Sequence, residues 1–190
     1  MEFMLRNQAV ELTKTGDEVA ICAPAKTDFF IDICTELKKA DAPFYYADVD
    51  GDFIIRSKVR PQFVSTYDAG CILIHESDEK WIKLAFENTD LGYPSIVSVV
   101  TNGISDDCNG ERIGEEAVWL QAMRKGDNWA LHYSADAVTW KMVRYFRLPM
   151  GRRVQAGISA QAPTGDSCRV TFQMPQISAN NYSDIRRMTK

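Results

Sequence analysis

Short runs of apolar, β-branched and aromatic residues recur along the chain, with turn-forming residues between them. Pairs such as Asp50-Gly51, Asn102-Gly103 and Gly126-Asp127 are typical of tight turns between antiparallel strands. Nine segments of this kind predict an all-β sandwich built of antiparallel meanders. The predicted strands are residues 52–60, 69–76, 80–87, 95–102, 117–125, 128–134, 140–147, 154–161 and 168–174.

The segment 81–87 shows the clearest alternation of apolar and polar positions. Ile82, Leu84 and Phe86 project to one side of an extended strand, and the odd-numbered residues from Trp81 to Glu87 project to the other. The apolar set is therefore expected to face the core. The preceding segment, 69–76, alternates less clearly and does not indicate which of its faces is buried.

The predicted outer side of strand 80–87 carries an indole ring, an ammonium group and a carboxylate. Trp81 would stack on the apolar face of a sugar, while Lys83 and Glu87 would hydrogen-bond its hydroxyls. The alternative is structural: a loop covers Trp81, and the two charged residues pair with neighbouring strands. The candidate ligand-binding residues are Trp81, Lys83 and Glu87, with His75, Glu76 and Arg124 as neighbours.

Two segments are predicted to lie outside the strand pattern. In DFFIDICTELKKA, Asp28 is a possible N-cap and the apolar residues follow at helical spacing, so we expect one or two short helical turns at most. The segment ISDDCNGE is predicted to be a loop in which Asp106, Asp107 and Glu111 cap backbone amides, with a cation site as the alternative.

Length and charge narrow the classes of function. The 190 residues suit one domain, with an ordered core over about 5–182 and tails at 1–4 and 183–190. The formal charge of −4 gives no overall electrostatic reason to bind nucleic acid or an anionic membrane. No secretion signal or membrane-sized apolar window is visible, so a cytoplasmic protein is expected.

The cysteines and histidines provide no template for a metal, disulfide or cofactor site. The five cysteines are scattered and never occur as C-x-x-C, so we expect reduced and mostly buried thiols. Only His75 and His132 are present, too few for a multi-histidine metal centre. Because the phosphate-binding, zinc-protease and serine-hydrolase motifs are also absent, we assign no catalytic residue, metal or cofactor.

Several ordered blocks of sequence resemble a known family. The strings YDAGCILI (67–74), WIKLAFEN (81–88), SIVSVVTNGISDDCNG (95–110) and WALHYSADAVTW (129–140) are similar to concanavalin A-like domains of unassigned activity. Some fungal members are described as regulators of enolase. The resemblance implies a jelly-roll sandwich of two antiparallel sheets and supplies no catalytic residue. Ala137 stands where the family has glycine, which would be costly if the position needs a positive φ.

Three functions remain open at this stage. The first is a non-catalytic, lectin-like module that binds a saccharide or similar small polar ligand on its concave sheet. The second, from the resemblance, is an intracellular regulator that docks on a metabolic enzyme such as enolase. The third is a cryptic glycoside hydrolase, which would need Glu76 and Glu87 to converge across adjacent strands.

Overall fold

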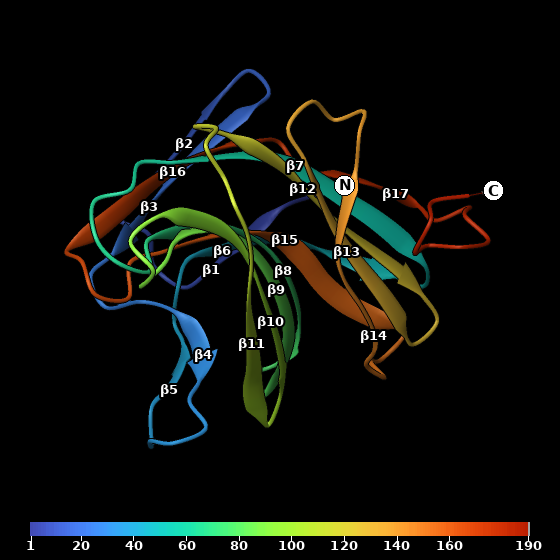
Figure 1. The fold of residues 1–190 in the computed structure, drawn as a ribbon, viewed down its shortest axis with the longest axis horizontal. Coiled ribbons are helices and arrows are strands. Elements are labelled where there is room, and N and C mark those ends of the chain that lie inside the picture. Colours follow the sequence, from blue (N-terminus) through green and yellow to red (C-terminus); the bar gives the residue numbers. More distant parts are fainter. Residues whose placement is uncertain (190) are drawn as a thin grey trace.

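Two antiparallel β-sheets pack face to face in the computed structural model, which describes residues 1–189 (Figure 1). The first sheet has seven strands in the order β1-β6-β15-β8-β9-β10-β11. The second has the order β14-β13-β12-β7-β16-β3-β2, and β17 also pairs with β7. Strands β4 and β5 form a separate hairpin beside the first sheet. No helix occurs among residues 1–189, so none of them forms a helix that could span a membrane.

The strand bounds of the first sheet are β1 Met4–Arg6, β6 Phe44–Asp50, β15 Arg153–Gln161, β8 Ala69–Ser77, β9 Lys80–Asn88, β10 Pro94–Asn102 and β11 Ile104–Arg112. Those of the second are β14 Lys141–Arg147, β13 Asn128–Ser134, β12 Val118–Lys125, β7 Phe53–Pro61, β16 Ser167–Gln173, β3 Glu18–Pro24, β2 Glu11–Thr15 and β17 Gln176–Ala179. The hairpin consists of β4 Phe29–Ile31 and β5 Lys38–Ala40.

The core lies between the inner faces of the two sheets. Ile82, Leu84 and Phe86 are fully buried there, which confirms the side of strand 80–87 that the alternation predicted. Burial of a side chain the size of Phe86 contributes roughly 2–3 kcal/mol. Strand β8 is buried on both faces from Ala69 through His75. This explains why its sequence does not alternate clearly between apolar and polar residues.

The predicted all-β jelly-roll sandwich is confirmed, and all nine predicted strands are present with ends within one residue of those expected. The loop predicted for ISDDCNGE is wrong, because the segment forms strand β11. Its residues are mostly exposed and carry no apolar alternation, so nothing in the segment marks it as a strand. It forms because β10 offers a free edge, and Thr101 and Ser105 face each other across the turn between them.

The helical turns predicted at 28–40 are wrong. Phe29 pairs with Ala40 and Ile31 with Lys38, so the segment is a β-hairpin. Asp32, at the tip, accepts hydrogen bonds from the amides of Cys34 and Thr35 at 2.7 and 2.8 Å. Tertiary packing outweighs the helical spacing, because only an extended chain sends Phe29 and Ile31 into one apolar cluster and Phe30 into another.

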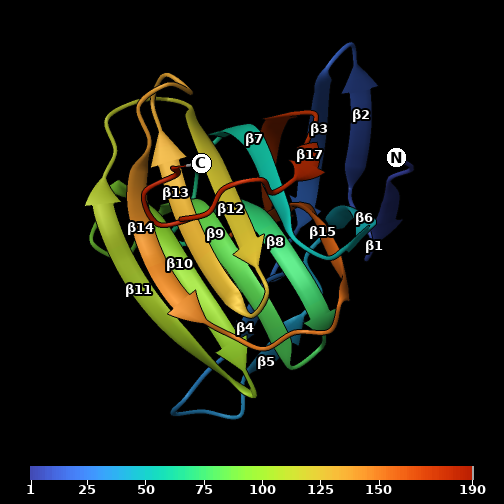
Figure 2. The same cartoon turned by 90° about the vertical axis from the view of Figure 1, so that its right-hand side faces the viewer.

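The C-terminal segment lies across the outer face of the second sheet (Figure 2). Residues 183–190 are predicted to be a tail, yet Ile185 is buried against Ile54, Met123 and Ala130; residue 190 lies outside the described residues. All five cysteines lie within the described residues and are unpaired. Cys71 and Cys168 are buried, but Cys34 and Cys108 are exposed, so the thiols are not mostly buried as expected.

Candidate functional site

A cavity of about 350 Å³ lies between the β4–β5 hairpin and the outer face of the first sheet, the face turned away from the second sheet. Strand β9 contributes two side chains to its floor, and β10, β11 and β15 contribute one each. The hairpin and the segments before β8 and after β15 form its walls. The lining residues are Asp28, Phe30, Asp32, Leu37, Tyr67, Lys83, Glu87, Val99, Asp107, Gln161, Pro163 and Thr164.

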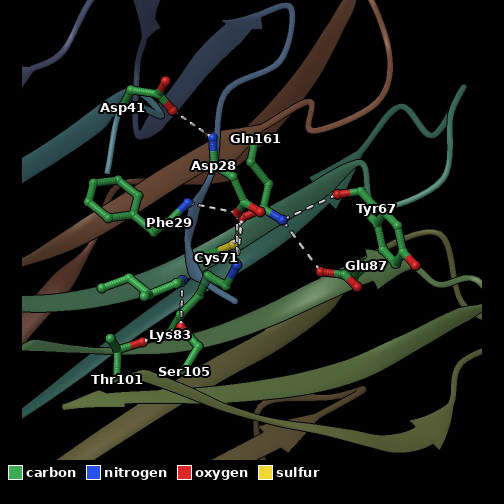
Figure 3. A network of polar contacts seen from close by, with 11 residues as sticks. Asp28, Phe29, Asp41, Tyr67, Cys71, Lys83, Glu87, Thr101, Ser105 and Gln161 are labelled. Carbon is green, nitrogen blue, oxygen red and sulfur yellow. Dashed lines mark hydrogen bonds and ion pairs between the residues drawn. The ribbon is translucent and has the colours of Figure 1, made fainter. Parts of the chain in front are cut away.

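Lys83 lies at the bottom of this cavity and is almost completely buried. Its Nζ donates hydrogen bonds to Oδ1 of Asp28 and Oε1 of Gln161, both at 3.0 Å (Figure 3). Burial is the largest single influence and by itself would lower the pKa of Lys83, but the acidic groups around it, Asp28 foremost, together outweigh burial and hold that pKa above its usual range. Lys83 is therefore a fixed cation whose charge is balanced by Asp28.

Glu87 projects from the same strand and is only 7% exposed. Its Oε2 accepts a long hydrogen bond of 3.4 Å from Nε2 of Gln161. Burial raises the pKa of Glu87 to about 8, Lys83 acts in the opposite direction, and the negative charges of Asp28 and Asp107 add to the rise. At neutral pH the Glu87 carboxyl is thus mostly protonated and can donate a hydrogen bond as well as accept one.

Gln161 connects the polar groups of the cavity floor. Its Oε1 accepts from Lys83, and from Sγ of Cys71 at 3.8 Å. Its Nε2 donates to the carbonyl of Tyr67 at 3.2 Å and to Glu87. These contacts are satisfied by one orientation of the amide, so the side chain is pre-organised. Nothing in the sequence indicates that Gln161 belongs to a functional site, because a single glutamine at the end of a strand forms no recognisable motif.

Tyr67 supplies an aromatic ring at the cavity and is 37% exposed. Its φ is +68°, a left-handed conformation that is rare for a bulky residue and costs about 1–2 kcal/mol. Hydrogen bonds hold this backbone: the amide of Tyr67 donates to Asn88 at 2.7 Å, and its carbonyl accepts from Gln161. Strained backbone at an exposed aromatic residue is a feature of ligand sites.

A family model described as a protein of unknown function, DUF1349, matches residues 4–180. The chain belongs to this family. A functionally unknown protein from Saccharomyces cerevisiae, itself a crystal structure, is 24% identical, with a TM-score of 0.89 over 94% of this chain and 96% of that one. No curated protein matches the chain.

Two further solved structures share the fold of this DUF1349 chain at low identity. Lectin I-B4 from Griffonia simplicifolia has a TM-score of 0.60 and 10% identity over 94% of this chain and 93% of that one. A xylan beta-1,4-xylosidase from Bacillus halodurans has a TM-score of 0.68 and 12% identity, with 85% of this chain covered but only 32% of the xylosidase. These likenesses establish a fold shared with lectins and with part of a glycoside hydrolase.

In the structure of this chain Trp81 lies away from solvent, which corrects the expectation of an exposed indole that stacks on a sugar. Trp81 is fully buried beneath the hairpin, with its ring centroid 5.6 Å from that of Phe29 in an edge-to-face contact. It also stacks on His75 at 6.4 Å. The alternative derived from the sequence, a Trp covered by a neighbouring segment, is the correct one for this residue.

His75 and Glu76 lie at the opposite end of the sheet from Glu87. His75 pairs with Trp81 across β8 and β9, whereas Glu87 pairs with Ala69. Glu76 is thus seven residues from the partner of Glu87, or about 23 Å along the strand. Carboxyl pairs in glycoside hydrolases are about 5–9.5 Å apart, so Glu76 and Glu87 do not form such a pair. Glu76 instead accepts from the Gly151 amide and pairs with Lys80 at 3.0 Å.

Arg124 belongs to the second sheet and does not reach the cavity. Its guanidinium donates to the carbonyls of Gly126, Met150 and Arg152 at 2.8–3.2 Å and fixes the adjoining turns. Of the six predicted residues, the cavity therefore includes Lys83 and Glu87 only. Among residues 1–189, no group of three or more histidine, cysteine, aspartate or glutamate side chains is arranged to hold a metal ion.

Proposed function

We propose that this DUF1349 protein binds a small polyhydroxylated ligand, of the saccharide class, in the cavity between the hairpin and the first sheet. The supporting observation is the pre-organised set of Lys83, Gln161 and Glu87 on its floor. Hydroxyl groups both donate and accept hydrogen bonds, and this set offers both functions at fixed positions. The apolar face of a sugar ring would lie against Tyr67 and Phe30, which take the role that the sequence analysis gave to Trp81.

The proposed role is binding without catalysis. The carboxyl pair that a hydrolase would have used, Glu76 and Glu87, lies at two ends of the sheet. Within the cavity, the carboxylate of Asp28 is engaged by Lys83 and by the amide of Phe29 at 2.7 Å. A carboxylate held in this way is a structural counter-ion and is poorly placed to attack a substrate or activate a water molecule.

The test is a glycan array followed by isothermal titration calorimetry of the saccharides that bind. Tyr67→Ala should raise Kd roughly threefold to tenfold through loss of the stacking surface. Tyr145→Ala is the matched control, because Tyr145 is also an exposed tyrosine but lies on β14 of the second sheet. If no saccharide binds at millimolar concentration, or both variants bind equally, the proposal fails.

A second candidate is docking on a metabolic enzyme such as enolase, in the cytoplasm, through the hairpin tip. Ile33 and Leu37 are 69% and 47% exposed at this tip, beside the cavity. Exposed apolar residues on a protruding hairpin favour a protein contact. Purified enolase should bind the native chain and lose binding to Ile33→Ser. It should bind Val138→Ser normally, since Val138 is also a highly exposed apolar residue but lies on a distant turn. Equal binding to both variants, or to neither, would rule this contact out.

A further inference from the structure

The cavity contains more carboxyl groups than cations. Asp28, Asp32, Glu87 and Asp107 line it together with one basic residue, Lys83. Lys83 is engaged by Asp28 at 3.0 Å, so its charge does not neutralise the other three acids. Asp32 is engaged by two backbone amides of the hairpin tip. Asp107 and Glu87 remain as carboxyl groups without a cationic partner among the residues that the structure describes.

Glu87 is the deepest of these unbalanced acids. It is more than nine-tenths buried, and the only hydrogen bond of its carboxyl group among residues 1–189 is the 3.4 Å contact from Gln161 to Oε2 (Figure 3). Oε1 has no hydrogen-bond partner within residues 1–189, and Glu87 is one of the residues that line the cavity. A buried carboxyl with a free oxygen and no ion pair of its own is unfavourable when it is ionised, and a cation placed beside it would reduce that penalty.

The apolar part of the lining suits the same kind of ligand. Tyr67 and Phe30 present aromatic rings, and Val99 and Pro163 fill the space between the acids. Aromatic faces attract ammonium groups, and the attraction is stronger where water is excluded. An anionic ligand, in contrast, would meet Asp32 and Asp107 with no free cation to bind it.

We propose that the ligand carries a protonated amine next to its hydroxyl groups, as an amino sugar does, and that the ammonium binds against the free oxygen of Glu87. This inference rests on the proposed function and specifies its ligand class. The hydroxyls would contact Lys83 and Gln161, while the carbon face of the ring lies on Tyr67.

Binding of an ammonium should release a proton from the protein. The charged groups around Glu87 are Lys83 on its own strand, Asp28 before β4, Asp90 after β9 and Asp107 on β11. With a pKa of about 8, Glu87 holds a proton at neutral pH in the free protein. When the ammonium binds, the carboxyl ionises, its proton passes to the buffer, and an ion pair forms in the cavity.

The experiment compares glucosamine, glucose and N-acetylglucosamine by titration calorimetry at about pH 6.5, where both the amine and Glu87 carry protons. Titration in two buffers of different ionisation enthalpy measures the protons released. Glucosamine should bind at least about tenfold more tightly than the two neutral sugars and release close to one proton per ligand. The neutral sugars should release none.

Glu87→Gln should reduce the preference for glucosamine to about twofold and abolish proton release. Asp127→Asn is the control, because Asp127 lies in the turn after β12 and pairs with Arg147 outside the cavity. Circular dichroism and thermal unfolding establish that both variants fold, and the proton count on the native chain is independent of any variant. If glucose binds as tightly as glucosamine, the amine is not recognised although saccharide binding stands. If no sugar binds, both proposals fail.

Discussion

Glu87→Gln should also change how the stability of the free protein depends on pH. Burial raises the pKa of Glu87 to about 8 in the folded chain, whereas an unfolded chain has a value near the ordinary 4.5. Between these two values the folded state retains a proton that the unfolded state has lost. The free energy of unfolding therefore falls as pH rises from about 4.5 to about 8, and levels off above that range.

The size of the effect follows from the difference in pKa. Each pH unit within the window costs about 1.4 kcal/mol, so three units from pH 5 to pH 8 cost at most about 4 kcal/mol. Glutamine has nearly the same shape and no charge, so the variant lacks this loss. It keeps the hydrogen-bonding capacity that faces Gln161. The variant should be similar to the native chain at pH 5 and more stable by roughly 2–4 kcal/mol at pH 8.

The assay is urea unfolding of both chains at several pH values, with the free energy extrapolated to zero urea. Groups that do not interact with Glu87 contribute the same pH dependence to both chains, so the difference between the two curves reports Glu87 and the groups that its charge affects, among them Lys83 and Tyr67. If the difference in the free energy of unfolding between the two chains does not grow from pH 5 to pH 8, the claim that Glu87 is buried without sufficient counter-charge is refuted. A variant that is less stable at every pH would have the same consequence.

Three further substitutions test the backbone conformation and the packing of the fold. Ala137 has a φ of +62°, a conformation that glycine adopts more easily than alanine. Ala137→Gly should therefore raise the free energy of unfolding by about 0.5–1 kcal/mol in urea titration. Unchanged stability would contradict the assigned turn. A Cβ on Gly157 would clash with the carbonyl oxygen of Tyr45. Gly157→Ala should therefore lower the melting temperature by several degrees. An unchanged melting temperature would contradict this close approach of the two backbones. Trp81→Ala should cost about 3–5 kcal/mol in the same urea assay, and a loss below about 1 kcal/mol would show that the indole is not packed beneath the hairpin.

The strands could be predicted from the sequence because most of them have one face in the core, which imposes a period of two on their apolar residues. Residues 80–87 illustrate both the value and the limit of that signal. The period assigned Ile82, Leu84 and Phe86 correctly to the core, but it gave no information on what covers the opposite side. Trp81 was assigned to solvent because alternation does not detect the β4–β5 hairpin, which lies more than forty residues earlier in the chain.

The same limit applies to the cavity. Lys83 and Glu87 were found because they share a strand, so their spacing alone places them on one side. Asp28 and Gln161 come from distant segments and meet Lys83 only through the topology, which sets β15 beside β8 and the hairpin across both. No local pattern encodes such a meeting. Ala137 shows the opposite case: the glycine at this position in related sequences marked alanine as costly if φ is positive, and φ is +62°.

The hairpin divides the outer face of β9 into two environments. Near Trp81 it seals the sheet, with Phe29 and Ile31 in contact with the indole cluster. The cavity begins two residues further along, at Lys83, and Phe30 packs on the small side chains around Ala85. The apolar contacts around Trp81 hold the hairpin in place. They thereby fix Asp28 beside Lys83 and place Asp32 at the rim of the cavity. Binding in the cavity should therefore depend on Trp81 without any contact between the indole and the ligand, because the indole holds the wall in place.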